Sequence, residues 1–211
     1  MQSCRQQQEP TEATQERFNA SPERSRNLRP SGWRGCQSPL EMLLSCHDKV
    51  KRFTDLSLRL AQYVHDQGAD EQAATAASRI RHYFQVAAPL HHQDEEKDLF
   101  PALESLFETG QDRQQGTQVL EQMELLRKQH STLESTWAEV DEWLEQITRH
   151  ERVAAPALLQ QFVDLYRQHM HIEENFVFPF AEQLDKHQQA EICLQMAMRR
   201  GLKSPNSKDS E

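Results

Sequence analysis

The chain has 211 residues and a net charge of −9, from 24 basic and 33 acidic side chains. This length suits one well-packed domain and is short for two. An acidic chain without a dense basic run argues against nucleic acid or an anionic membrane surface as the main partner. No apolar run approaches the ~18 residues of a transmembrane helix, and the polar start, MQSCRQQQEP, does not resemble a signal peptide.

The residue content also bears on the fold class and the compartment. With six glycines and few β-branched runs, the composition indicates an all-α protein. The four cysteines show no paired spacing such as C-x-x-C, so we expect free thiols and a cytoplasmic protein.

Both ends of the chain are polar. Residues 1–37 carry three prolines and show no apolar period, which predicts a disordered N-terminal tail. Recognition of a protein partner by this tail is the alternative reading. Residues 202–211 are likewise predicted to be a disordered C-terminus.

Between the tails, apolar residues recur at steps of three and four, the spacing of helices that bury one face. The predicted long helices cover residues 39–67, 70–107, 117–150 and 155–184. A loop is expected at 108–116, and a shorter helix follows Asp185. Long helices with short connections predict an up-down-up-down four-helix bundle over residues 38–201, with a short extra C-terminal helix.

Each long helix carries one histidine on its apolar stripe. The third helix shows this most clearly, because His130 lies between Leu126 and Leu133. The four stripe histidines, in chain order, are His47, His91, His130 and His169. Since the stripes face one another in a bundle, the four imidazoles are expected to meet in its interior.

Two of these histidines begin a repeated phrase, HHQDEEKDLFP at residues 91–101 and HMHIEENFVFP at residues 169–179. In both copies a His precedes a Glu by four residues, as His91/Glu95 and His169/Glu173. This spacing places the imidazole and the carboxylate on one helix face, one turn apart. Such a pair can chelate a metal ion.

Two buried carboxylates favour a metal site over an uncharged core. Burying them close together costs several kcal/mol unless a cation compensates their charge. A metal-free network of His–Glu hydrogen bonds is the alternative. Four imidazoles and two carboxylates without a thiolate suit iron, manganese or zinc, and exceed the four ligands of a structural zinc site. We therefore predict two ions bridged by the carboxylates, held by His47, His91, Glu95, His130, His169 and Glu173.

The order of these residues, with the phrases EEKDLFP and EENFVFP, resembles that of hemerythrin-like, HHE cation-binding domains. The resemblance covers about residues 39–184. It implies a non-haem centre of two iron ions, bridged by the two glutamates and an oxo or hydroxo group, with manganese or zinc as the less expected metals.

The ligand layout departs from that of oxygen-carrying hemerythrins. Those proteins have a second His one turn after the third-helix His, and an H-x-x-x-x-D pair on the last helix. Here Glu134 follows His130, and the last helix carries H-x-x-x-E. This layout is closer to that of the di-iron proteins associated with repair of iron–sulfur clusters.

Counting coordination positions suggests a reactive centre. Two six-coordinate irons offer about twelve positions, of which the predicted ligands and an oxo bridge occupy about ten. About two stay open, or one if Glu134 also binds. The leading hypothesis is a protein that binds or senses dioxygen, nitric oxide or peroxide. The alternatives are a di-iron enzyme or iron donor in the stress response, and a bundle in which metal only holds the helices.

Several neighbouring residues have weaker predictions. His92 with Glu96 is the alternative chelate of the first phrase, and otherwise His92 and His171 are expected to point away from the stripe. Phe100, Phe176 and Phe178 are expected to exclude water from the site, and Phe176 lies on the predicted inward stripe of the last helix.

Overall fold

In the computed structural model, residues 38–109 and 113–202 are described, and all regular structure within them is helical. The predicted first and third helices are α2 (Pro39–Gln67) and α6 (Arg113–Thr148). The second is a continuous rod of α3 (Glu71–His82), η1 (Tyr83–Ala87), α4 (Ala88–Asp94), η2 (Glu95–Leu99) and α5 (Phe100–Thr109). The fourth predicted helix consists of α7 (Leu159–Ile172), η3 (Glu173–Val177) and η4 (Phe178–Gln183), and α8 (Lys186–Arg199) follows it. The second and fourth predicted helices are called the second and fourth rods below.

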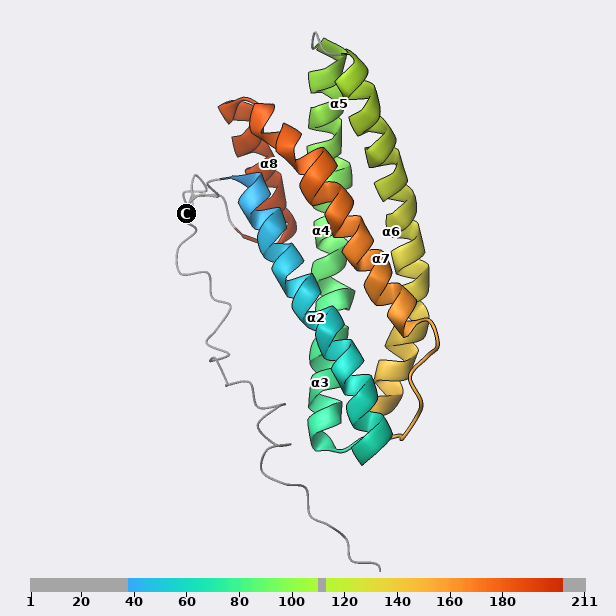
Figure 1. Cartoon of the computed structure of the whole chain (residues 1–211). Coiled ribbons are helices and arrows are strands. Elements are labelled where there is room, and N and C mark those ends of the chain that lie inside the picture. Colours follow the sequence, from blue (N-terminus) through green and yellow to red (C-terminus); the bar gives the residue numbers. More distant parts are fainter. Residues whose placement is uncertain (1–37, 110–112, 203–211) are drawn as a thin grey trace, which may run out of the picture. The chain divides into compact units, whose positions relative to one another are not determined.

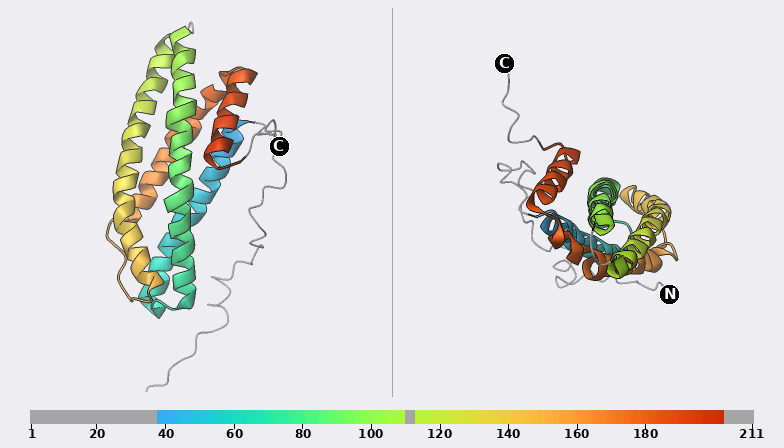
Figure 2. Two further views of the ribbon diagram at one scale, coloured as in Figure 1. Left: turned by 180° about the vertical axis from the view of Figure 1, so that it is seen from behind. Right: turned by 90° about the horizontal axis from the view of Figure 1, so that it is seen from above.

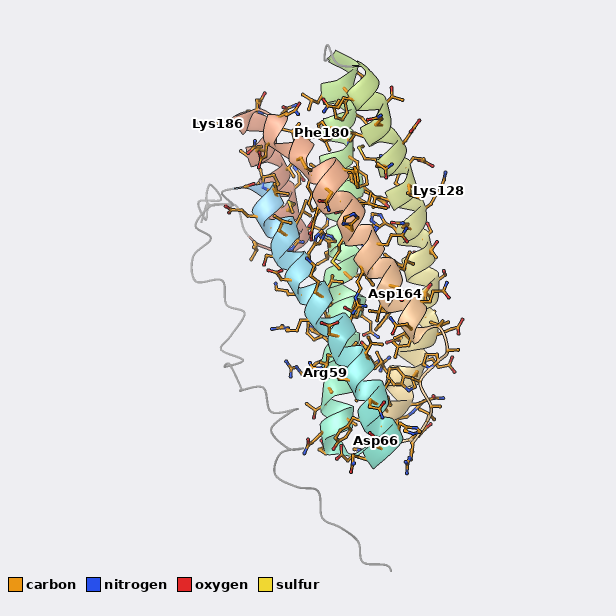
Figure 3. The ribbon with its side chains drawn as sticks, in the orientation of Figure 1. Arg59, Asp66, Lys128, Asp164, Phe180 and Lys186 are labelled. Atoms are coloured by element: carbon orange, nitrogen blue, oxygen red, sulfur yellow. The ribbon has the colours of Figure 1, made fainter. Side chains whose placement is uncertain are left out.

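These helices form the predicted four-helix bundle (Figure 1). Helix α2 packs against α3 and α7, and α6 packs against the same two helices from the other side. The view along the bundle in Figure 2 shows the resulting ring, with α8 beside α2 and outside it. The charged side chains of Arg59, Lys128 and Asp164 lie exposed on the outer surface (Figure 3). None of the described helices combines the length and apolarity needed to cross a bilayer.

Local sequence signals account for several helix ends. Gly68 ends α2 with φ +94°, a conformation that favours glycine, and its N–H bonds to the Val64 carbonyl. Asp185 and Gln188 form the predicted capping box at the start of α8.

Two predicted boundaries need correction. The loop expected at 108–116 is shorter, because α5 extends to Thr109 and α6 begins at Arg113. The last long helix begins at Leu159 and not at residue 155, since Pro156 interrupts the helical hydrogen bonds and its carbonyl accepts the Leu159 N–H. The predicted tails at 1–37 and 202–211 lie outside the described residues, except Leu202, whose N–H bonds to the Ala197 carbonyl.

Three π-helical turns, η1, η2 and η3, interrupt the second and fourth rods, and each is followed by a proline. In each, the N–H just before the proline bonds five residues back, linking Ala88 to Tyr83, Phe100 to Glu95, and Phe178 to Glu173. A proline cannot donate to the carbonyl four residues back, and its ring pushes that carbonyl away. A wider turn relieves this clash, so the phrase that ends in Phe-Pro builds a π turn at each candidate bridging glutamate.

The π turn in η3 explains one wrong prediction. An extra residue in the turn rotates the following side chains relative to a regular helix. Phe176 is therefore 49% exposed, whereas Val177 and Phe178 are 0% and 2% exposed. Phe178, and not Phe176, is therefore the phenylalanine that is buried in the bundle interior next to η3.

Helix α8 is tied to the second rod by ion pairs. Asp94, which directly precedes Glu95, is fully buried and accepts hydrogen bonds from Arg199 and Arg200. Arg199 also pairs with Asp98 at 2.7 Å. The short C-terminal helix therefore compensates a buried carboxylate next to the candidate centre.

The described cysteines differ in state. Cys46 is a free, buried thiol on α2, and desolvation raises its pKa. Cys193 on α8 is disulfide-bonded, so the expectation of a free thiol is wrong at this position. Cys4 and Cys36 lie outside the described residues.

Candidate metal centre

All six predicted ligands meet in the bundle interior. Helices α2 and α6 each supply one histidine, and the second and fourth rods each supply a histidine and a glutamate. All six residues are buried, and none is more than 6% exposed. They are His47, His91, Glu95, His130, His169 and Glu173.

The six residues divide into two sets that share both carboxylates. One set holds His47 and His91 with the two glutamates, and the other holds His130 and His169 with the same glutamates. Within each set, one donor atom per residue lies within 4.8 Å of all the others. Two adjacent four-donor sets with two members in common are the arrangement that the bridging hypothesis requires.

The imidazoles turn the same nitrogen toward the centre. The Nε2 atoms of His47 and His91 are 3.2 Å apart, and those of His130 and His169 are 3.1 Å apart. A proton or a cation between such nitrogens is needed to avoid lone-pair repulsion.

The outward Nδ1 atoms fix the tautomer of three histidines. His47 Nδ1 donates to Glu174 Oε1 at 2.8 Å, and His130 Nδ1 donates to Glu96 Oε1 at 2.6 Å. His169 Nδ1 donates to the amide oxygen of Gln129 at 3.0 Å. Because these acceptors require the proton on Nδ1, the Nε2 of each neutral imidazole presents a lone pair to the centre, as metal-bound histidines do.

The carboxylates are close to these nitrogens without being hydrogen-bonded to them. Glu173 oxygens lie 3.0 Å from His47 Nε2 and 2.7 Å from His169 Nε2. Glu95 oxygens lie 3.4 Å from Nε2 of His91 and of His130. All four oxygens are nevertheless buried without a hydrogen-bond partner. Convergent lone pairs and unpaired carboxylate oxygens fit a pair of cations.

The local electrostatics make protons compete for this centre. Burial, with repulsion from Glu173, raises the pKa of Glu95 well above its usual range. Glu173 is equally buried, but the imidazoles of His169 and His47 outweigh desolvation and hold its pKa well below the usual value. Burial opposes protonation of His47, yet Glu173 and Glu174 raise its pKa. A cation must therefore displace protons from Glu95 and His47.

Comparison with known families agrees with this geometry. The model of the hemerythrin HHE cation-binding domain matches residues 38–181, more than half of the chain, and a second match covers residues 121–199. The chain belongs to the hemerythrin HHE family. An uncharacterized protein of Haemophilus influenzae is 31% identical over 177 residues, which cover 83% of this chain and 98% of that protein. Membership of the hemerythrin HHE family and the two donor sets together indicate a cation-binding centre.

The structure also places the residues beside the six. His171 is exposed, in agreement with the choice of His169, and His91 lies in the first donor set, so the alternative chelate is not needed. Glu134 is exposed on α6 and is in neither of the two shared sets, so it is not brought to the centre.

The residues that orient the histidines were predicted only in part, since the sequence placed Glu96 and Glu174 around the candidate ligands or on the surface and gave no role to Gln129. Glu96 and Glu174 each follow a candidate bridging glutamate, and each accepts a hydrogen bond from a histidine of another helix. The repeated Glu-Glu doublet was the available signal. Gln129 gave no comparable signal, because a buried glutamine next to a ligand is recognisable only once the helices are packed.

A cavity of about 280 Å³ adjoins the centre on the α6 side. Of the six candidate ligands, His130 is the one that lines it. Its other walls are Phe84, Ala88, Pro89, His92, Gln93, Glu96, Ser131, Leu133, Glu134, Trp137 and Tyr166.

Proposed function

We propose that this hemerythrin-family chain is a non-haem di-iron protein that binds or senses dioxygen, nitric oxide or peroxide. The observation that carries the proposal is the sharing of Glu95 and Glu173 between two donor sets. One isolated ion would need only one set, whereas two shared carboxylates suit two ions held side by side.

The donor chemistry supports iron. Imidazole and carboxylate suit iron, manganese and zinc, and the sets contain no thiolate. A pair of irons would supply redox activity and affinity for small ligands, which a closed structural zinc site lacks.

The donor count supports open positions. Four imidazoles, two bridging carboxylates and an oxo or hydroxo bridge would occupy about ten of twelve octahedral positions. Because Glu134 is exposed and outside both shared sets, it does not reduce the number that remain. The cavity lined by His130 supplies space for a small ligand next to the centre.

The surrounding side chains keep the centre oriented and dry. Phe178 stacks on His47 with ring centroids 5.3 Å apart, and Phe100 lies parallel to His130 at 6.5 Å. Both phenylalanines are buried. With Glu174 and Glu96 holding the Nδ1 protons, they limit rotation of two imidazoles and exclude water from their faces.

The test is anaerobic reconstitution with ferrous iron, followed by metal analysis and by absorption spectra on admission of oxygen or nitric oxide. We expect about two irons per chain and a ligand-dependent charge-transfer band. Glu173→Ala should lose both irons, since Glu173 belongs to both donor sets, while the matched variant His171→Ala should keep them.

Two results would refute the proposal: retention of two irons by Glu173→Ala, or an unchanged spectrum of the iron-loaded protein with every ligand tried. Recovery of the ligand unchanged would separate a binder from an enzyme that consumes it.

A further inference from the structure

His92 lies against the second donor set without belonging to the predicted six. Its ring stacks on that of His130, with centroids 4.0 Å apart and planes inclined by 15°, and it meets the His169 ring edge-on at 5.6 Å. A ring nitrogen of His92 lies within 4.8 Å of ring nitrogens of both residues. The Nε2 atom of His92 is buried and has no hydrogen-bond partner.

The stacking separates the role of His92 from that of His130. An imidazole binds a metal ion in the plane of its own ring, along the nitrogen lone pair. Two nearly parallel rings 4.0 Å apart have planes that do not converge on one ion. His92 is therefore placed beside an ion held by His130 and His169, and is not itself directed at that ion.

His92 also borders the cavity that adjoins the centre. Both His92 and His130 line it, so a small molecule in the cavity lies next to His92 and to one member of the second donor set. The equivalent position in the other copy of the repeated phrase is Met170, which is 3% exposed and whose side chain has no N–H to donate. The two copies of the phrase thus differ in hydrogen-bonding capacity.

We propose that the exogenous ligand binds on the His130/His169 side of the centre, where the His92 imidazole donates a hydrogen bond to it. This inference rests on the proposed function and adds to it the side of binding and a positioning residue. Polar or anionic ligands that accept a hydrogen bond are selected over apolar ones of the same size.

Azide is a suitable probe, because it is a small anion that accepts hydrogen bonds and perturbs the spectrum of ferric centres. Azide titrations of the iron-loaded protein should compare wild type with His92→Leu and His92→Met, which remove the donor, and with His92→Gln, which retains one. Met170→Leu is the matched control, since it alters the equivalent buried position in the other copy of the repeated phrase at nearly constant volume.

The donor-free variants should keep the iron content of the wild type and weaken azide binding by roughly 10- to 100-fold, the effect of losing a hydrogen bond to a charged group. His92→Gln should restore most of the affinity, and Met170→Leu should bind azide as the wild type does.

Each contrary result has a distinct meaning. A folded, iron-loaded donor-free variant that binds azide normally overturns the inference and leaves the proposed function intact. Loss of iron from both donor-free variants also overturns it, because His92 would then be a ligand or a support of the centre. An iron-loaded wild type that binds neither azide nor any other small ligand overturns the proposed function, and the inference with it.

Discussion

Replacing Glu174 by alanine should weaken one of the two proposed ion sites and leave the other. Glu174 Oε1 accepts the His47 Nδ1 proton at 2.8 Å, and His47 belongs to one donor set only. Without this acceptor the imidazole loses both its preferred tautomer and its fixed orientation.

The size of the expected loss of metal affinity follows from the exposure of the Glu174 carboxylate. A hydrogen bond to a charged group contributes about 1.5–3 kcal/mol when it is shielded from water. The Glu174 side chain is 30% exposed and also pairs with Lys51 at 2.9 Å, so solvent screening reduces its contribution to about 1–1.5 kcal/mol. This corresponds to roughly a tenfold loss of affinity, at the lower end of the range for residues that orient metal ligands.

Anaerobic titration with ferrous iron under a competing chelator measures this effect. Glu174→Ala should give one weakened class of site and one unchanged class, and Glu174→Gln should fall between it and the wild type. Glu182→Ala, which removes an exposed glutamate of η4, is the control. Wild-type affinity for both ions in Glu174→Ala would refute the role assigned to this residue.

Three further predictions concern protonation, the C-terminal helix and the π turn. The raised pKa values of His47 and Glu95 keep both side chains protonated to higher pH, so iron must displace their protons. Affinity for iron should therefore rise with pH, and proton release should accompany binding. Binding that does not depend on pH would contradict this. Asp94→Ala leaves two arginines without their buried partner and should lower the free energy of unfolding by about 3 kcal/mol, measured by urea titration. An unchanged midpoint of urea unfolding would contradict this. Phe178→Ala should lower the free energy of unfolding by about 3–4 kcal/mol, whereas Phe176→Ala should lower it by less than about 1 kcal/mol. Equal effects would contradict the rotation of side chains by the π turn in η3.

The convergence of the six candidate ligands was predictable because they follow helical periodicity. Each lies on a stripe with steps of three and four, and a bundle turns such stripes toward a common interior. The His-x-x-x-Glu spacing then selects His169 over His171, whose exposure agrees with that choice.

What could not be predicted depends on departures from that period and on packing between helices. Phe176 was placed inside because a regular helix was assumed through the phrase ending in Phe-Pro, where the chain forms a π turn. The stacking of His92 on His130 and the pairing of Asp94 with two arginines join segments far apart in sequence. No local pattern encodes such contacts.

The sharing of donors between the two Glu-Glu helices has a consequence for how the protein is assembled. Each ion set takes a histidine from one of these helices, both bridging carboxylates, and an orienting glutamate: Glu174 for the His47/His91 set and Glu96 for the His130/His169 set. A nascent chain that ends before Glu173 therefore holds neither set complete. Since Glu173 lies near the end of the last long helix, we expect the proposed irons to enter only after synthesis of the bundle is nearly finished.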